Sequence, residues 1–283
     1  MLRRMLRDLC HTKVPGRYVA VEALSFAYTD RDEPLVRIGS RGKLSCDLRD
    51  QVQRQIYFGI YDEPETRLAR RLCTPGSVCL DVGANVGYYT ILMADAVGSS
   101  GMVHAFEPIP DLADRLERNA ELSGLSQIRL NRAAVTTTSG ELELFVRAGV
   151  TNSGWASVVP SPGHENVAVR VPAVTIDGYV AAEGLEQVRL VKMDIEGAEP
   201  GALAGGAQLF SRDDAPDVLC EVNPFLLDRA GSSAADLLQR FEGYGYRLFR
   251  IDRSGFTELH ASTAESALMN VIATKAPARV LSA

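Results

Sequence analysis

The segment VCLDVGANVGYYT at residues 78–90 constrains the fold of this chain more than any other part of the sequence. It begins as a short apolar strand that ends in Asp81, and it passes through the run GANVG at residues 83–87 into a helical pattern. A glycine-containing turn between a strand and a helix is typical of parallel α/β sheets, where it lets the backbone approach a bound ligand. The segment therefore predicts a ligand site at the carboxyl end of an early strand.

The chain that follows continues to alternate short apolar strands with helical segments. The pattern predicts strands at 78–81, 102–107, 128–135, 141–146, 167–174, 188–194, 217–222, 246–251 and 267–273, and helices at 87–97, at 111–123, from 199 onward and at 233–242. An alternation of this type predicts an α/β fold with a doubly wound, Rossmann-like parallel sheet.

Two segments stand outside this alternation. Residues 1–66 are predicted to form an N-terminal cap on a domain that spans residues 67–283. The cap opens with a basic amphipathic helix, which we expect to pack on its own domain or on a partner subunit of a homo-oligomer; contact with a membrane surface and a targeting peptide are the alternatives. Within the domain, the Gly-, Ser- and Pro-rich stretch at 149–166 predicts an inserted hairpin or lid.

The composition excludes several classes of protein. With 46% hydrophobic and 23% charged residues the chain is typical of a globular protein. No apolar run approaches 18 residues and no secretory signal is evident, so we expect a cytoplasmic protein without a transmembrane segment. The net charge of −6 argues against a nucleic-acid partner. The five cysteines form no CxxC pair, which favours free thiols in a reducing compartment.

The residues of the glycine turn narrow the class of ligand. No lysine follows the glycines, which excludes a nucleoside-triphosphate P-loop, and Asn85 stands where a dinucleotide fingerprint needs its second glycine. S-adenosylmethionine is the remaining class, because a carboxylate at Asp81 suits its cationic groups. Glu107, at the tip of the next predicted strand, is placed to accept hydrogen bonds from ribose hydroxyls. A purely structural turn, with Asp81 as a capping carboxylate, is the alternative.

A second group of ionisable residues follows the strand predicted at 188–194. In an extended segment Lys192, Asp194 and Glu196 lie on one face, since side chains alternate with a period of two. The carboxyl ends of strands line the ligand crevice of an open α/β sheet, so this cluster is expected beside the glycine turn. We therefore predict that these three residues are catalytic.

The same carboxylates are also candidate metal ligands. Oxygen ligands from Asp194, Glu196 and Glu221 suit a hard cation such as Mg²⁺. In the alternative interpretation, Lys192 pairs with one of the acids and the others cap the helix that begins near Glu199. The sequence leaves both interpretations open.

Six motifs together resemble the FkbM-type methyltransferase family, within the class I S-adenosylmethionine-dependent methyltransferases, over about residues 57–274. They are YFGIYDEPET, LDVGANVGYYT, GMVHAFEP, NRAAV, VKMDIEGAEPGAL and VLCEVNP. The resemblance implies a seven-stranded sheet with one antiparallel edge strand. It also implies methyl transfer to a small-molecule acceptor, usually to a hydroxyl oxygen of a natural product, sugar or lipid.

The resemblance also implies roles for individual residues. Asp194 would face the transferred methyl group, and Glu107 would bind the ribose. The remaining cofactor contacts would come from Asp81, Gly83, Ala84, Asn85, Gly87, Pro108, Arg132 and Ala133.

Activation of the acceptor has several candidates. Asp194 or a bound Mg²⁺ would lower the pKa of the acceptor hydroxyl, and Lys192 is an alternative partner for the developing alkoxide. His164 and His260 are further candidate bases. The alternatives for the whole protein are N- or C-methylation and a cofactor-binding module without catalysis.

Overall fold

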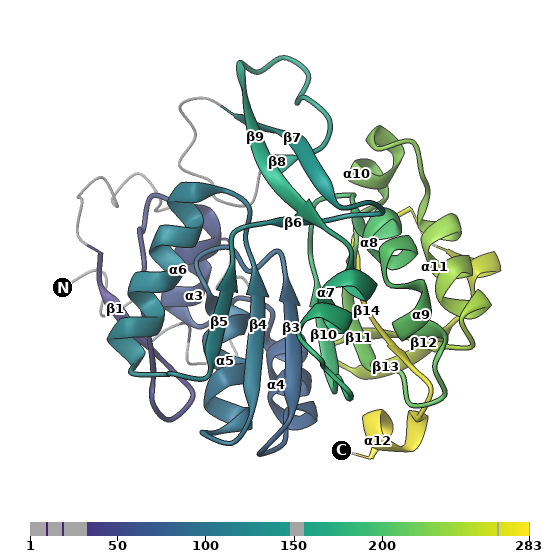
Figure 1. Cartoon of the computed structure of the whole chain (residues 1–283), viewed down its shortest axis with the longest axis horizontal. Helices are drawn as coiled ribbons and strands as arrows, with labels where there is room; N and C mark the ends of the chain where they lie inside the picture. Colours follow the sequence, from purple (N-terminus) through teal and green to yellow (C-terminus); the bar gives the residue numbers. More distant parts are fainter. Residues whose placement is uncertain (1–9, 11–18, 20–32, 148–155, 265, 283) are drawn as a thin grey trace.

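The computed structural model describes residues 10, 19, 33–147, 156–264 and 266–282. A large central sheet carries helices on both faces, and a smaller sheet stands above the carboxyl ends of β3, β4 and β5 (Figure 1). The predicted doubly wound α/β fold is therefore confirmed.

The strand order of the large sheet is β13-β12-β14-β11-β10-β3-β4-β5. The strands are β3 (Val78–Val82), β4 (Met102–Phe106), β5 (Ile128–Asn131), β10 (Leu190–Met193), β11 (Asp217–Val222), β12 (Arg247–Asp252), β13 (Gly255–Leu259) and β14 (Met269–Thr274). β4 and β5 extend to one side of β3, and β10 and β11 extend to the other, all in parallel. The order of the chain thus reverses between β3 and β10, and ligands bind at this kind of switch point.

The expectation of seven strands with one antiparallel edge strand is wrong in two respects. Within the described residues the sheet has eight strands, because β13 pairs with β12 as a hairpin. β13 is itself an antiparallel edge strand, but a second antiparallel strand, β14, lies inside the sheet between β11 and β12. The sequence GFTEL of β13 is only weakly apolar and mostly solvent-accessible, so it has little of the pattern by which strands are recognised.

Alternating side chains of the strands divide the core between the two faces of the sheet. Cys79 and Leu190 join one hydrophobic cluster, whereas their chain neighbours Leu80 and Val191 join the other. The first cluster contains buried residues of α3 (Gln51–Phe58), α4 (Glu63–Leu72), α5 (Tyr88–Val97) and α12 (Pro277–Leu281). The second contains buried residues of α7 (Ile176–Ala182), α8 (Glu199–Gly205), α9 (Ala207–Ser211), α10 (Pro224–Arg229) and α11 (Ala234–Gly243). Both faces of the central strands are therefore covered, as their continuous apolar sequences require.

The strand predicted at 128–135 is two strands in different sheets. β5 ends at Asn131, whereas β6 (Ala134–Val135) pairs with β9 (Asn166–Val174) of the smaller sheet. β7 (Gly140–Arg147) pairs antiparallel with β9, and β8 (Ala156–Ser157) pairs with β7. β7 and β9 are the strands predicted at 141–146 and 167–174, and they flank the stretch 149–166, for which a hairpin stays a prediction. Residues 148–155 lie outside the described part of the chain, and a lid function for 149–166 stays a prediction.

The described part of the cap shares its core with the domain. β1 (Leu35–Ile38) and β2 (Gly42–Ser45) form a two-stranded antiparallel sheet, and Ile38 and Leu44 belong to the same hydrophobic cluster as α5. The boundary predicted after residue 66 falls inside α4. The amphipathic helix and its subunit contact lie almost wholly outside the described residues.

α6 (Pro110–Ser123) lies beside β5, the strand at one edge of the large sheet. Pro110 stands at its first turn, where proline is favoured, and Gly124 ends it in a left-handed conformation. Among the described residues, no helix is long and apolar enough to cross a membrane.

Candidate active site

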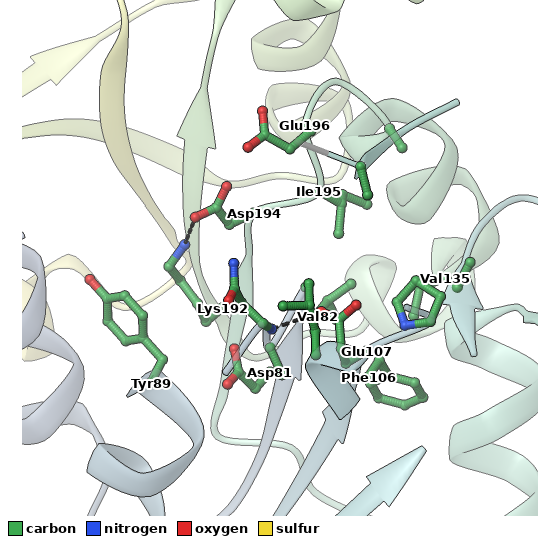
Figure 2. Close-up of a pocket in the computed structure, with 18 of the residues that line it drawn as sticks. Asp81, Val82, Tyr89, Phe106, Glu107, Val135, Lys192, Asp194, Ile195 and Glu196 are labelled. Atoms are coloured by element: carbon green, nitrogen blue, oxygen red, sulfur yellow. Dashed lines mark hydrogen bonds and ion pairs between the residues drawn. The ribbon is translucent and has the colours of Figure 1, made fainter. Parts of the chain in front are cut away.

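A cavity opens at the carboxyl ends of β3, β4 and β10. It encloses about 1070 Å³ of space free of protein atoms, part of it open to solvent. The sequence-predicted residues that line it are Asp81, Gly83, Ala84, Asn85, Glu107, Pro108, Ala133, Lys192, Asp194 and Glu196. Figure 2 shows Tyr89 beside Lys192, whose amino group points to Asp194, while Glu107 lies across the cavity toward Phe106 and Val135. The two predicted clusters therefore meet in one site.

Gly83 joins the two clusters directly. Its φ is 84°, and a Cβ at this position would collide with the carbonyl oxygen of Asp194. The glycine is thus required because the β3 turn packs against the segment after β10, not only because a ligand approaches the backbone. Asn85, with φ 52°, continues the turn in the left-handed region.

Glu107 is held by backbone amides of two loops. Its Oε2 accepts from the amide of Asn85 at 2.8 Å and its Oε1 accepts from the amide of Ile109 at 2.9 Å. Each carboxylate oxygen keeps a further lone pair for a hydroxyl donor. Burial raises the pKa of Glu107 to about 7, although both amides act to lower it.

Asp81 lies at the bottom of the cavity and is almost fully buried. Its Oδ2 accepts a short hydrogen bond from the hydroxyl of Thr90 in α5, which orients the carboxylate. Burial raises the pKa of Asp81 to about 6, against the lowering effects of Thr90 and Lys192.

Lys192 is the one cation that lines the cavity within the described ranges. Its Nζ is 3.2 Å from Asp194 Oδ2 and 5.0 Å from the centroid of the Tyr89 ring. Burial acts to lower the pKa of Lys192, but the charges of Asp194 and Asp62 outweigh it and raise that pKa above its usual value. Lys192 therefore stays protonated and cannot serve as a base.

With Glu196 and Glu221 included, several carboxylates surround this one lysine. Burial, with the charges of Asp194 and Glu221, raises the pKa of Glu196 well above its ordinary value. The charge of Asp194, followed by burial, raises the pKa of Glu221 to about 8. Glu221 does not line the cavity, but it adds to a negative field that one lysine does not neutralise.

The residues present do not fit a magnesium ion. In the portion of the chain that the structure describes, no three His, Cys, Asp or Glu side chains are grouped to hold a metal. Asp194 is paired with Lys192, and Glu199 Oε1 accepts from the amides of Ile195 and Gly197 at the start of α8. These contacts match the alternative interpretation of the sequence, and the Mg²⁺ prediction gains no support.

The structure does not bring every predicted residue to the cavity. The Arg132 guanidinium turns outward to Asp114 at 2.7 Å and Glu117 at 3.0 Å, because both carboxylates project from the neighbouring helix α6. Gly87 caps α5 and packs against Leu116 instead of lining the cavity. The further candidate bases, both histidines, also lie outside the lining.

Sequence reasoning missed an aromatic cluster. The rings of Tyr61, Tyr88 and Tyr89 line the cavity, and the centroids of the Tyr61–Tyr88 and Tyr88–Tyr89 pairs are each 5.4 Å apart. The Tyr89 hydroxyl donates to Asp62 Oδ2 at 3.2 Å, and burial raises the pKa of Asp62 to about 6. The motifs YFGIYDEPET and GYYT contain these residues, so the signal was present in the sequence.

One part of the lining consists of apolar side chains and one serine. These residues come from α3, β7, β8 and the residue after β8, namely Val52, Ile56, Leu142, Leu144, Ala156, Ser157 and Val158. We call this set the roof. The charged residues of the lining, Asp81, Glu107, Lys192, Asp194 and Glu196, are called the floor.

Known proteins resemble this chain over part or most of its length. A family model for the methyltransferase FkbM domain matches residues 81–248. 31-O-demethyl-FK506 methyltransferase FkbM from Streptomyces tacrolimicus is 27% identical in an alignment 161 positions long that covers 46% of this chain and 60% of that protein. 2-O-methyltransferase NoeI from Sinorhizobium fredii is 25% identical in an alignment 155 positions long that covers 49% of this chain and 60% of that protein.

Other relatives match a shorter part. Protein-L-isoaspartate O-methyltransferase from Methanococcoides burtonii is 30% identical over 96 residues, covering 29% of this chain and 47% of that protein. The chain thus spans about half the length of the curated relatives it matches. Among solved structures, the cofactor-bound Rv0187 from MTB has a TM-score of 0.44 at 13% identity, covering 91% of this chain and 88% of that one.

The family match includes every residue of the floor. It begins at Asp81, passes through Glu107 and continues beyond the segment from Lys192 to Glu196. It extends over more than half of the sequence. The chain therefore belongs to the FkbM methyltransferase domain family.

Proposed function

We propose that this protein transfers a methyl group from S-adenosylmethionine to a hydroxyl oxygen of a small molecule. The observation that carries the proposal is the floor, where four carboxylates and one lysine lie at the switch point of the sheet. The names of the FkbM and NoeI relatives support oxygen as the accepting atom, since one is a methyltransferase of a 31-O-demethyl compound and the other is a 2-O-methyltransferase.

The residues of the floor fit such a cofactor. Its sulfonium and ammonium groups favour a cavity in which carboxylates outnumber cations, and its ribose hydroxyls suit Glu107. In this proposal Asp81 faces the ammonium group and Asp194 faces the sulfonium that carries the methyl group, while Pro108 and Ala133 contact the adenine. When bound, S-adenosylmethionine supplies a methyl group on a good leaving group.

The residues around Asp194 would then prepare the acceptor. Asp194 accepts the proton of the acceptor hydroxyl as the oxygen attacks, and the proton later leaves to solvent. Lys192, 3.2 Å away, keeps that carboxylate in position and stabilises negative charge on the oxygen. Most of the rate enhancement would come from alignment of the two reactants.

A comparison of binding with turnover tests the proposal. Asp194→Asn is expected to reduce methyl transfer by about 100-fold or more, and calorimetry should show S-adenosylhomocysteine affinity within about threefold of the parent protein. Exposed Asp214→Asn serves as the control, because its side chain lies on the surface and pairs with Arg212.

Three outcomes would contradict parts of the proposal. Failure to bind either form of the cofactor would reject cofactor dependence. Binding without methyl transfer to any acceptor would favour a binding module. A product methylated at nitrogen or carbon, identified by NMR, would reject oxygen as the acceptor atom.

A further inference from the structure

We infer that the acceptor is a neutral, mostly apolar molecule that presents a hydroxyl group, and not an anionic or polyhydroxylated one. The inference rests on the proposed function, because it assumes that the cofactor occupies the floor. It is carried by the contrast between the floor and the roof of one cavity.

The described residues of the roof offer an acceptor few hydrogen-bonding groups. They are aliphatic except for Ser157, whose hydroxyl oxygen accepts from the amide of Val159 at 3.3 Å and whose O–H is left to donate. A polyhydroxylated acceptor would lose water at each hydroxyl facing the aliphatic side chains without gaining a partner. An apolar body would instead bury its surface favourably against them.

Two separate parts of the chain build the roof. Val52 and Ile56 come from α3, before the family match begins, whereas Leu142 and Leu144 come from β7 in the smaller sheet. In Figure 1 β7 rises above the carboxyl ends of β3, β4 and β5. Leu144 is buried in a cluster with Ile109, so this part of the roof is anchored to the domain.

The charge of the floor opposes an anionic acceptor. Four carboxylates line the cavity, and the one lysine of the described lining is already paired with Asp194. Burial and mutual repulsion raise the pKa values of Asp81, Glu107 and Glu196, so this site already resists full ionisation. A phosphate or carboxylate on the acceptor would add a further unpaired negative charge.

Two arginines outside the lining belong to the surroundings of the cavity. Arg147 does not line it, but its charge interacts with that of Glu196. Arg229 lies outside the lining, and its Nη2 donates to the carbonyls of Val159 and Pro160 at 3.0 and 2.8 Å. It therefore holds the loop that follows Val158, and it supports the roof instead of lining the cavity.

Three six-membered carbocycles with matched rings test the inference. 4-tert-Butylcyclohexanol is neutral and apolar, 4-hydroxycyclohexanecarboxylate is anionic, and myo-inositol is polyhydroxylated. Calorimetry on the full chain saturated with S-adenosylhomocysteine should show the first binding at least tenfold more tightly than either of the others. Equal or tighter binding of the anion or the polyol, or no binding of the apolar alcohol, would overturn the inference.

Substitutions in the roof test whether these side chains contact the acceptor. Val52→Asn and Val158→Asn are each expected to weaken binding of 4-tert-butylcyclohexanol at least tenfold, with S-adenosylhomocysteine affinity changed less than threefold. Val167→Asn is the matched control, because Val167 is exposed on β9 outside the cavity. Loss of S-adenosylhomocysteine affinity with unchanged alcohol binding would mean that the roof covers the cofactor, which overturns the inference. If the parent protein binds no S-adenosylhomocysteine, the proposed function fails instead.

Discussion

The two ends of strand β11 carry buried carboxylates in opposite electrostatic settings. Asp217, at the amino end, is fully buried and accepts from Thr274 Oγ1 at 2.6 Å and from Arg279 Nη2 at 3.0 Å, with Arg189 3.9 Å away. Glu221, at the carboxyl end, faces Asp194 and Asp62 as well as Lys192. The carboxylate at the amino end of β11 therefore lies beside arginines, whereas the carboxylate at the carboxyl end lies among other carboxylates that outnumber the nearby lysine.

The difference separates the structural end of the sheet from the functional end. Arg279 belongs to α12, and Arg71 of α4 donates to the carbonyls of Val280 and Ser282, so the matched charges hold the end of the chain on the domain. The excess of carboxylates around Glu221 lowers the free energy of unfolding of the ligand-free protein, because buried like charges repel. A cationic ligand would relieve that cost, which explains why a sequence would keep such an arrangement.

Asp217→Asn should produce the largest change in stability. Removing the charge from this fully buried group weakens its bonds to Thr274 and Arg279, and we expect the free energy of unfolding to fall by about 2 kcal/mol. Urea denaturation followed by circular dichroism measures the change. Affinity for S-adenosylmethionine should be unaltered in the folded variant, and an unchanged urea midpoint would remove the structural role assigned to this carboxylate.

Glu107→Gln should affect the cofactor and not the fold. The amide has one acceptor oxygen where the carboxylate has two, so it loses a contact to either a backbone amide or the ribose. We expect S-adenosylmethionine to bind about tenfold more weakly, a loss of about 1.4 kcal/mol, as measured by calorimetry. Glu141→Gln, an exposed change on β7, is the control. Equal affinity in the Glu107 variant would show that this carboxylate only joins the two loops.

Glu221→Gln should raise the free energy of unfolding, whereas Asp217→Asn should lower it. It removes one member of a repelling group, and we expect the free protein at pH 8 to gain about 1 kcal/mol in the free energy of unfolding. The same urea experiment measures both variants. A loss of stability comparable to that of Asp217→Asn would mean that the two ends of β11 do not differ as described.

Changes of pH test the surplus of carboxylates without a substitution. Burial raises the pKa of Glu107 to about 7, and the charge of Asp194 with burial raises that of Glu221 to about 8, so the folded protein holds protons that the unfolded chain releases near pH 4.5. Stability of the free protein should therefore fall as pH rises from about 4.5 to about 8.

Ionisation of Glu107 and Glu221 as the pH rises should also strengthen the binding of a cationic ligand. Between pH 6 and pH 8 we expect the affinity for S-adenosylmethionine, relative to the uncharged thioether S-adenosylhomocysteine, to increase by about threefold. Calorimetry with both compounds at each pH measures the ratio. A ratio independent of pH would indicate that the sulfonium does not interact with these carboxylates.

Sequence reasoning reached the floor because strand topology is locally encoded. The alternation of apolar strands with helices predicts parallel strands, and parallel strands carry residues that follow them, such as Asp81, Glu107 and Asp194, to one edge of the sheet. It did not predict the outward position of Arg132, which the resemblance placed among the cofactor contacts. The carboxylates of α6 that hold Arg132 lie 15 and 18 residues away, beyond the reach of local periodicity.

The sequence by itself determined the α/β class, the glycine turn and the family, because each depends on residues close together in the chain. The tertiary structure decided which groups meet. Gly83 packs against the carbonyl of Asp194, and Lys192 pairs with Asp194, which the sequence also offered as a magnesium ligand. The tertiary structure also decided that Tyr61 of the cap lines the cavity and that β13 joins the sheet. Periodicity reports that a side chain is buried, but its partner depends on how distant segments pack.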